Sequence, residues 1–589
     1  MINKIKENKK YSLKEFINII LYHKTILISI ISISIFTSLI SAYRPKLIQK
    51  AIDSHIINRN FIGFRNLLIL SVILLFIESI FQFILLYLSS ILSQKVISKI
   101  RMLLFEKLIH FKSSFFNKTP LGKIISYSIS DVETINVIFN DGILLISGDV
   151  LKIVMIIIIM YTIHHKLSII VLLTIPFIYF ITRLFQKTLR KTFREERIYT
   201  SQLNSFIQEN IVGMFIIQLF HKEKEKYLKF KSINNKLMNA HIKTIFYFSI
   251  FFPVVELLSA FTISMVIFYG GIYSINKNEI KPGQIIAFIF FIYLLFRPMR
   301  QVADRFNIIQ RGITGIERIF SILNDNNEYS EKFICKKNLN IKKIEGHIIF
   351  NNVYFSYSKK ENMILNGISF EINPGEKVAI IGNTGSGKST IVQLISRFYN
   401  IKKGNIYIDN HSINDFNLNN LRSHIKIVSQ NTFLFNDSIL NNITLGNPEI
   451  NINMVKNMAK KIGIHDMIKS FPNGYKYIVR ERGGILSLGE KQLISILRVQ
   501  MHPYSILIFD EATTSLNYEL DKMIQNAIDF ITKKKTSIII THRVSTLTNV
   551  DKIIIINKGN IIEYGTHNEL ININGGYYSS LYNKKSIIN

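Results

Sequence analysis

The chain has 589 residues, of which 48% are hydrophobic, and its 72 Lys and Arg against 40 Asp and Glu give a formal net charge of +32. This length exceeds that of one ordinary domain, so two or three domains are expected. A soluble protein so basic would suggest nucleic acid as a partner. In a membrane protein, however, such charge lies where helices meet the cytoplasm beside anionic lipid. The single cysteine, Cys335, excludes an internal disulfide framework and a metal site built from several cysteines.

Six apolar stretches in the first 300 residues are candidates for membrane-spanning helices, since about 20 apolar residues in a helix cross a bilayer. They are Thr25–Tyr43, Leu67–Leu92, Ile143–Ile163, Leu167–Phe185, Ile245–Ile267 and Gln284–Phe296. The last stretch is short, so we expect its helix to continue past Arg297. The first follows several lysines but lacks a small-residue cleavage site, which predicts a retained helix rather than a signal peptide.

Basic residues predict how these spans are oriented. The connections after spans two and four, roughly Ser93–Asn140 and Gln186–His241, are long, amphipathic and rich in Lys and Arg, and the amino terminus is also basic. We therefore place all three in the cytoplasm, although the loop after span one is basic too and fits the rule poorly. Each cytoplasmic connection contains a turn signal, at Asn117–Gly122 and at Asn210–Gly213. Such turns are natural places to contact another domain.

The composition changes after the sixth span. Residues 324–346 are polar and charged, which is typical of a linker, and from Ile348 onward short β-rich runs alternate with helical stretches. The predicted organisation is therefore an α-helical membrane domain over residues 1–323, a linker over 324–346 and an α/β domain over 347–589.

A glycine-rich loop lies between a predicted buried strand, Lys377–Ile381, and a predicted helix, Thr390–Ile395. The loop consists of Gly382, Asn383, Thr384, Gly385, Ser386, Gly387, Lys388 and Ser389. This strand–loop–helix context is what a phosphate-binding loop requires, because glycines let backbone N–H groups converge on phosphate oxygens at a helix amino end. We expect this loop, with Thr390, to bind ATP. Lys388 would contact the β and γ phosphates, and the Ser389 hydroxyl would ligate Mg²⁺.

Two acids follow the apolar run Ile506–Phe509. Asp510 is predicted at the carboxyl end of a strand, where open parallel sheets place their chemistry, and a carboxylate there would hold Mg²⁺ directly or through water. Glu511 is the candidate general base that polarises the attacking water. Together with the phosphate loop, this pair indicates ATP hydrolysis.

The segment Leu486-Ser487-Leu488-Gly489-Glu490 resembles the signature of ABC-type ATPases. The resemblance implies that Ser487 and Gly489 face the phosphates of a nucleotide held by a second chain. It also implies roles for three residues upstream and downstream of the signature. These are Tyr357, which would stack on adenine, Gln430, which would join the Mg²⁺ site to the membrane domain, and His542, which would reach the γ-phosphate.

The resemblance covers nearly the whole chain. Asn117–Glu133 and Gln208–Phe230 look like the first and second intracellular loops of ABC exporters, and the chain is similar to bacterial multidrug-resistance-like half-transporters that form one member of a heterodimeric pair. The resemblance implies six transmembrane helices followed by a cytoplasmic ATPase domain in the inner membrane. It further implies ATP and Mg²⁺ as ligands, a second half-transporter and membrane lipid as partners, a hydrophobic or amphipathic small molecule as substrate, and no nucleic acid.

Two positions depart from the family pattern. Glu490 stands where the signature usually has Gln, and Asn517 stands where the loop after Glu511 usually has Asp. Because Ser487 and Gly489 are intact, the change at Glu490 should have a modest effect. The loss of charge at Asn517 places communication between the two ATP sites in doubt, but not ATP binding. The departure at Asn517 favours a distinct partner chain over a homodimer.

Several alternatives stay open. Six spans followed by one ATPase domain are also compatible with a lipid or peptide flippase, an ATP-gated channel or a regulatory subunit. A soluble ABC ATPase that acts on DNA or ribosomes would not have six spans. Glu78 and Glu256 lie near the middle of spans two and five. Because acids within a membrane usually face a cavity or a partner, they would either attract a cationic substrate or pair with residues of neighbouring helices.

Overall fold

The computed structural model describes residues 14–139, 144–277, 279–325, 339–357, 362–480, 483–510, 518–541, 547 and 549–586. The chain forms two compact units. The first consists of residues 1–109 and 119–326, and the second of residues 110–118 together with 327–589.

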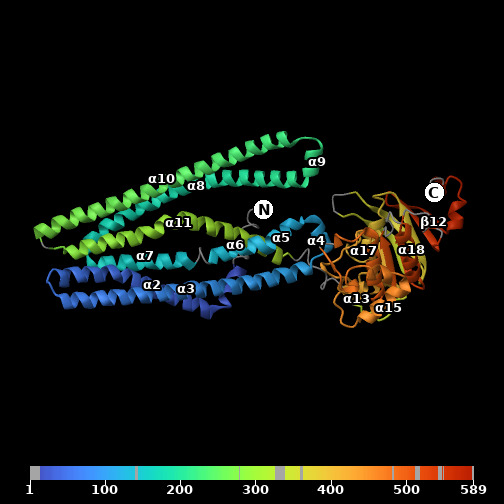
Figure 1. Ribbon diagram of the computed structural model, residues 1–589, viewed down its shortest axis with the longest axis horizontal. Helices are drawn as coiled ribbons and strands as arrows, with labels where there is room; N and C mark the ends of the chain where they lie inside the picture. Colours follow the sequence, from blue (N-terminus) through green and yellow to red (C-terminus); the bar gives the residue numbers. More distant parts are fainter. Residues whose placement is uncertain are drawn as a thin grey trace. The chain divides into compact units, whose positions relative to one another are not determined.

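Long helices build the first unit (Figure 1). They are α2 (Lys24–Lys50), α3 (Phe61–Ile109), α7 (Leu144–Ile163), α8 (His165–Val212), α10 (Glu223–Lys277) and α11 (Pro282–Leu323). Short helical pieces connect them: a helix over residues 14–21, a π-helical turn at Ala51–Ile56, α5 (Leu121–Ser126), a π-helical turn at Tyr127–Asp131, α6 (Val132–Val137) and α9 (Met214–Leu219). In Figure 1, α8 and α10 run side by side and are joined through α9.

The six predicted apolar stretches fall in six of these helices, apart from Ile143, which lies outside the described residues. Four described helices are long and apolar enough to cross a membrane: Lys24–Ile56, Phe61–Ile109, His165–Val212 and Glu223–Ile275. The third stretch corresponds to the 20-residue α7, and the sixth to the shorter apolar segment Pro282–Pro298 of α11. The expectation that the sixth helix continues past Arg297 is confirmed, because α11 runs to Leu323.

Several helices exceed what a bilayer requires. The 55 residues of α10 correspond to about 80 Å at about 1.5 Å per residue, against a hydrocarbon core of about 30 Å. Both predicted turns are confirmed: α8 ends at Val212 with Gly213 as its C-cap, and α4 (Ser113–Lys118) ends just before Pro120, the N-cap of α5. The helices therefore extend well beyond any membrane before the chain turns back.

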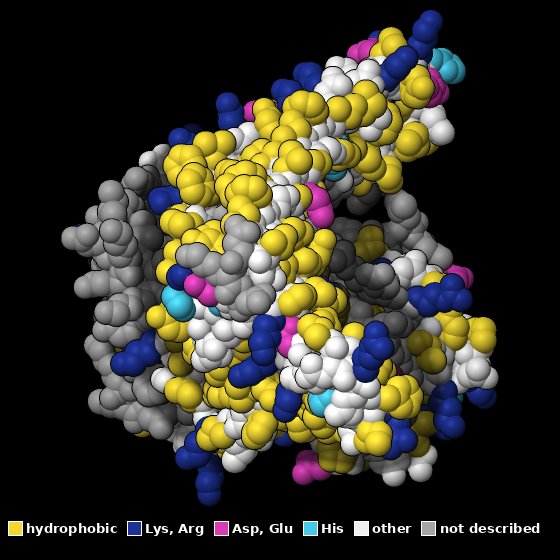
Figure 2. Space-filling model, turned by 90° about the vertical axis from the view of Figure 1, so that its left-hand side faces the viewer, with side chains coloured by type: hydrophobic (Ala, Val, Ile, Leu, Met, Phe, Trp, Pro, Cys, Tyr) yellow, Lys and Arg dark blue, Asp and Glu magenta, His cyan; other side chains and the backbone are white. Residues whose placement is uncertain are grey.

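Hydrophobic side chains lie both inside the first unit and over its surface. A buried cluster joins Val171 of α8, Val255 of α10 and Phe291 of α11. Large hydrophobic side chains are also exposed on several helices, among them Phe76 and Phe83 of α3, and Figure 2 shows hydrophobic side chains over much of the visible face. Such a surface suits helices whose solvent is lipid.

The second unit contains the α/β elements and α4. Its strands are β1 (Ile348–Phe355), β2 (Leu365–Ile372), β3 (Lys377–Gly382), β4 (Lys403–Ile408), β5 (His411–Ser412), β6 (Ile425–Ser429), β7 (Asp437–Ser438), β8 (Ile478–Val479), β9 (Ile506–Asp510), β10 (Thr536–Ile540), β11 (Lys552–Asn557) and β12 (Asn560–Gly565). Its helices are α12 (Lys388–Ile395), α13 (Leu418–His424), α14 (Ile439–Thr444), α15 (Ile452–Ile462), α16 (His465–Lys469), the 3₁₀ turn Gly474–Lys476, α17 (Leu488–Gln500), α18 (Tyr518–Thr532), α20 (His567–Ile571) and α21 (Tyr577–Ser586).

A six-stranded sheet in the order β12-β11-β3-β10-β9-β6 positions the site. The pairs β11·β3, β3·β10, β10·β9 and β9·β6 are parallel, and only the edge strand β12 is antiparallel. The central strands β3, β10 and β9, together with β11, are buried along most of their length, as expected for parallel strands covered on both faces. The carboxyl ends of β3 and β9 therefore meet at one edge of this sheet, and there the predicted ATP site should lie.

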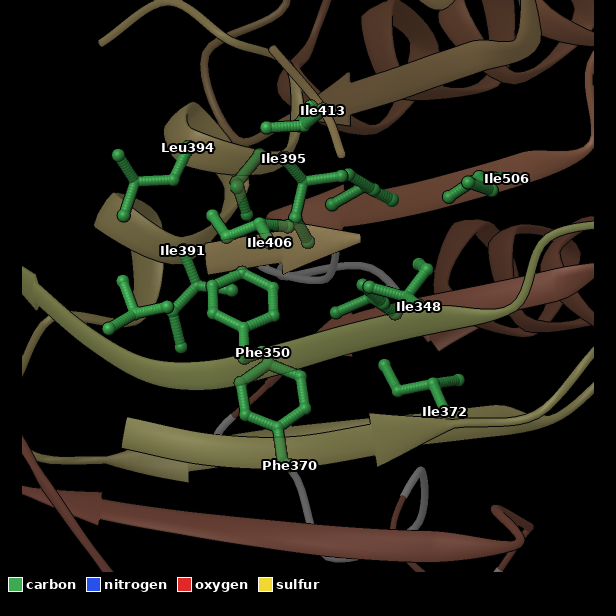
Figure 3. Close-up of a cluster of buried hydrophobic side chains, with 14 of the residues drawn as sticks. Ile348, Phe350, Phe370, Ile372, Ile391, Leu394, Ile395, Ile406, Ile413 and Ile506 are labelled. Carbon is green, nitrogen blue, oxygen red and sulfur yellow. The ribbon is translucent and has the colours of Figure 1, made fainter. Parts of the chain in front are cut away.

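A second, four-stranded sheet in the order β2-β1-β4-β5 packs over the first through a shared core. Phe350 of β1 and Phe370 of β2 stack with ring centroids 4.4 Å apart (Figure 3). Figure 3 also shows Ile391 and Ile395 of α12 in this cluster. The buried face of the phosphate-loop helix is thus fixed by the core, which holds its amino end in place.

Candidate nucleotide-binding site

The glycine loop adopts a backbone that glycine is needed to form. Gly387 is the N-cap of α12 with a φ of 107°, a left-handed conformation that strains any residue with a Cβ. A Cβ on Gly382 would lie 2.1 Å from the backbone oxygen of Ile556, so β3 and β11 can approach closely only with glycine there. The loop is therefore held between the sheet and α12, with the amino end of that helix available for an anion.

Lys388 is buried at the base of this loop. Its side chain is 6% exposed, and its Nζ donates to the backbone oxygens of Gly382 at 2.8 Å and Asn383 at 3.0 Å. The two carbonyl groups hold the ammonium inside the loop, where phosphate oxygens of a nucleotide would be its natural charged partners. Its predicted contact with the β and γ phosphates stays a prediction.

The predicted Mg²⁺ ligands converge at the carboxyl edge of the sheet. Ser389 Oγ lies 3.4 Å from Asp510 Oδ1. Gln430 directly follows Ser429, whose Cα is paired with that of Asp510 between the parallel strands β6 and β9, and Gln430 is exposed. A hydroxyl, a carboxylate and an amide oxygen at one edge are the hard oxygen donors that Mg²⁺ prefers, with phosphate and water as its remaining ligands. The residues present therefore fit the ion.

Tyr357 lies against α12, the helix that follows the phosphate loop. Its hydroxyl donates to Gln393 Oε1 at 2.8 Å and lies 3.1 Å from Thr390 Oγ1, and burial raises the pKa of this hydroxyl. Its ring meets the ring of Tyr399 edge-on, with centroids 4.9 Å apart. The side chain remains 37% exposed, so part of the ring is accessible beside the phosphate loop.

The signature segment forms the start of α17. Ser487 is the N-cap, and its Oγ accepts from the backbone N–H of Glu490 at 3.3 Å. The Glu490 carboxylate in turn accepts from the backbone N–H of Ser487 at 2.7 Å and from its hydroxyl at 2.8 Å. Glu490 thus completes a capping box, and both polar groups of the exposed Ser487 are engaged by its carboxylate. Gly489 is buried behind it.

Three predicted positions, Glu511, Asn517 and His542, lie outside the described residues. The strands that precede two of these positions are described: β9 ends at Asp510 and β10 at Ile540, and these ends are paired. The roles of all the predicted site residues stay predictions.

Sequence reasoning missed two contacts near the loop. Tyr577 of α21 donates its hydroxyl to Asn383 Oδ1 at 2.9 Å, and Asn117 of α4 donates its Nδ2 to the Tyr399 hydroxyl at 2.7 Å. Each pair is separated by more than 190 residues, so no local motif could have indicated it. Tyr399 thus connects α4 with Tyr357.

Comparison with known proteins agrees with this geometry. Two family models match the chain, the ABC transporter transmembrane region over residues 26–299 and the ABC transporter model over residues 365–514. The chain belongs to the ABC transporter family. Its helical membrane domain is followed by the family's ATPase domain, and the chain is a membrane-spanning ABC exporter.

Two relatives match over most of their length. The multidrug resistance-like ATP-binding protein MdlA of Buchnera aphidicola is 35% identical over 592 residues, covering 99% of each chain. The ATP-dependent lipid A-core flippase of Syntrophus aciditrophicus is 32% identical over 536 residues, covering 90% of this chain and 88% of the relative. A solved structure of a bacterial Atm1-family ABC exporter with ATP bound matches with a TM-score of 0.80 over 95% of this chain and 98% of that chain. Its 23% identity supports the fold alone.

Proposed function

We propose that the chain is half of a dimeric exporter that uses ATP hydrolysis to expel hydrophobic or amphipathic compounds. The observation that carries the proposal is the convergence of Lys388, Ser389 and Asp510 at the edge of a parallel sheet. The six apolar helices that precede this ATPase supply the route through the membrane. The proposed boundaries are residues 1–323, 324–346 and 347–589, with the amino terminus and the ATPase domain in the cytoplasm beneath the inner membrane.

The chemistry follows from the residues at this edge. Lys388 and the loop N–H groups bind the β and γ phosphates, while Ser389, Asp510 and Gln430 are the candidates to hold Mg²⁺, which supplies charge neutralisation on the phosphate oxygens. Glu511 accepts the proton of the attacking water, and His542 contacts the γ-phosphate. ATP favours a closed pair of nucleotide domains, so its binding and hydrolysis shift the membrane helices between two states.

Replacing the proposed base tests the reaction. Glu511→Gln keeps the size of the side chain but removes its basicity, so ATP should still bind while turnover falls on the order of 10²-fold or more. ATP binding and phosphate release should both be measured on the transporter in lipid nanodiscs. Glu449→Gln, at an exposed position between α14 and α15, is the matched control and should leave turnover unchanged. Unchanged turnover in Glu511→Gln contradicts the assignment.

We further propose that the second half-transporter is a different chain. The support is Glu490, whose carboxylate engages both polar groups of Ser487 and would bring negative charge toward the phosphates bound by a partner. A partner with a standard signature would complete the ATP site of this chain, while this chain would complete the partner's site less well. Purification of the tagged chain from its native membrane, with the partner identified by mass, tests this. Recovery of a homodimer alone contradicts it.

A lipid flippase is the second candidate, and the similarity to a lipid A-core flippase favours it. Both candidates share the ATP chemistry and differ only in the transported compound. ATP turnover in nanodiscs that responds to the lipid composition, and not to added drug-like amphiphiles, would select the flippase. Stimulation by amphiphiles at constant lipid composition would select the exporter of small compounds. Steady ion current without turnover would instead select a channel.

A further inference from the structure

A polar pocket lies between α2, α3 and α7, with a volume of about 220 Å³. All its lining residues fall within the first three apolar stretches, so the pocket is at membrane depth. Four hydroxyl-bearing residues of α2 line it: Ser34, Thr37, Ser38 and Ser41. We call this cavity the span pocket. Polar groups are costly in this setting unless they have partners, and within membrane helices they usually mark a functional site.

The acid of this pocket is already paired. Glu78, which is 6% exposed, accepts from Arg44 through Oε2 at 2.8 Å and from Gln82 through Oε1 at 3.4 Å. Both carboxylate oxygens are therefore engaged by donors of the chain itself. This geometry favours pairing between neighbouring helices over the attraction of a cationic substrate by Glu78. Glu256 does not line the pocket.

The pocket holds charges of both signs. Asp149 and Lys152 both line it and lie three residues apart on α7, a spacing that places opposite charges side by side on a helix. Arg44 adds a positive group through its pair with Glu78, and Arg297 is close enough to interact with Lys152. A cationic head would therefore find no excess of negative charge, whereas a neutral or zwitterionic group would find donors and acceptors of both kinds.

One hydroxyl of the pocket has no partner within the described part of the chain. Ser34 is 5% exposed, and its Oγ makes no hydrogen bond there. In contrast, the Thr37 and Ser38 hydroxyls donate to the backbone oxygen of Ser34 at 2.9 and 2.7 Å. Leaving a buried hydroxyl unpaired costs free energy, and a ligand group that reached it would remove that cost.

We propose that the span pocket binds the neutral or zwitterionic head of the compound that the exporter moves, with Ser34 Oγ as a direct contact. Leu85 and Leu86 form part of the lining and provide apolar surface for the adjoining part of an aliphatic chain. This inference rests on the proposed export function and narrows its substrate class. It excludes a simple organic cation as the preferred ligand.

The test uses three amphiphiles that share a dodecyl tail and differ in the head: dodecyl maltoside, dodecylphosphocholine and dodecyltrimethylammonium. Each is added below its micelle concentration to the transporter, purified with its partner in nanodiscs, and stimulation of ATP turnover is measured. We expect the neutral or zwitterionic compound to stimulate at lower concentration than the cation.

Ser34→Ala should raise the half-maximal concentration for that compound about three- to ten-fold, the effect of one lost hydrogen bond. The mutation orphans no protein group, because Ser34 Oγ has no partner among the described residues, so a purely structural serine predicts no shift. Ser29→Ala is the matched control, since that hydroxyl bonds to the Thr25 backbone on an exposed part of the same helix.

The outcomes distinguish a failure of the span-pocket inference from a failure of the proposed function. Preference for the cation, or equal stimulation of Ser34→Ala and the parent, overturns the inference. Absence of stimulation by all three compounds, with turnover still lost in Glu511→Gln, also overturns the inference but leaves the ATPase assignment intact. Turnover that persists in Glu511→Gln overturns the proposed function itself.

Discussion

The phosphate loop and the signature segment both lie at the amino end of a helix, but their polar side chains differ in burial and in their hydrogen-bond partners. At the start of α12, Lys388 is buried and held by two backbone carbonyls. At the start of α17, Ser487 is exposed and is engaged by the carboxylate of Glu490. The amino end of α12 is therefore open to an external anion, whereas at the amino end of α17 the carboxylate of Glu490 already bonds to Ser487.

Under the proposed function, this difference would give one chain a standard ATP half-site at the phosphate loop and an altered one at the signature. A helix amino end attracts negative charge through its free N–H groups and its dipole. An internal carboxylate satisfies that demand and stabilises the helix, but it competes with an external phosphate for the same groups. At the phosphate loop the acid is Asp510, whose carboxylate lies 3.4 Å from Ser389 Oγ, where it would help to hold Mg²⁺.

Lys388→Ala should give the largest effect. It removes the charge that we propose to bind the β and γ phosphates, so ATP turnover should fall on the order of 10²–10³-fold. Phosphate release from the purified transporter is the measurement. Lys460→Ala, at an exposed position of α15 outside the phosphate loop and the signature, is the control. Turnover within two-fold of the parent in Lys388→Ala would mean that this chain's loop does not bind the hydrolysed nucleotide.

Glu490→Gln tests the same comparison at the signature segment. Gln keeps the length of the side chain and removes its negative charge. The repulsion between two unit charges about 4 Å apart in water is about 1 kcal/mol, which corresponds to about a five-fold change in ATP affinity. We expect ATP to bind more tightly at the site that this signature completes, measured as a lower ATP concentration for half-maximal turnover. Weaker ATP binding in Glu490→Gln would show that the carboxylate supports the partner's site.

Ser487→Ala should lower stability as well as activity. Loss of an N-cap hydroxyl costs about 1 kcal/mol, so the thermal midpoint of the ATPase domain should fall by a few degrees. Ser438→Ala, at the N-cap of α14, provides a matched loss of a cap away from the signature. If both variants lose stability but only Ser487→Ala loses turnover, the hydroxyl has a role beyond capping. Equal turnover in the two variants would limit Ser487 to capping.

Tyr399→Phe should give the smallest effect. It removes the hydroxyl that accepts from Asn117 and leaves the ring beside Tyr357. A single partly exposed hydrogen bond contributes about 1 kcal/mol, so basal turnover should change less than about five-fold. Substrate stimulation should fall further than basal turnover, since α4 loses its link to the tyrosine pair. Parallel loss of both rates would show that Tyr399 acts only on nucleotide binding.

Much of the architecture could be read from the sequence because it depends on local patterns. Apolar stretches of sufficient length predict helices in membrane, and the strand–loop–helix around Lys388 follows from a buried run, glycines and a helical period. The turns at Asn117–Gly122 and Asn210–Gly213 were also predictable, since Pro and Gly act on the residues next to them. The lengths of the helices beyond the apolar stretches were less accessible, because their amphipathic ends carry no span signal.

Only the tertiary structure decided which distant residues meet. Parallel pairing brings Ser429 opposite Asp510, and helix packing joins Arg44 to Glu78, which the sequence left between a substrate contact and an internal ion pair. The sequence alone determined that this chain crosses a membrane and carries an ABC-type ATPase, because both signals are short-range. The partners of its buried charges depend on packing between segments far apart in the chain. Side-chain periodicity predicts which residues share one face of a helix, but it does not predict which other helix packs against that face.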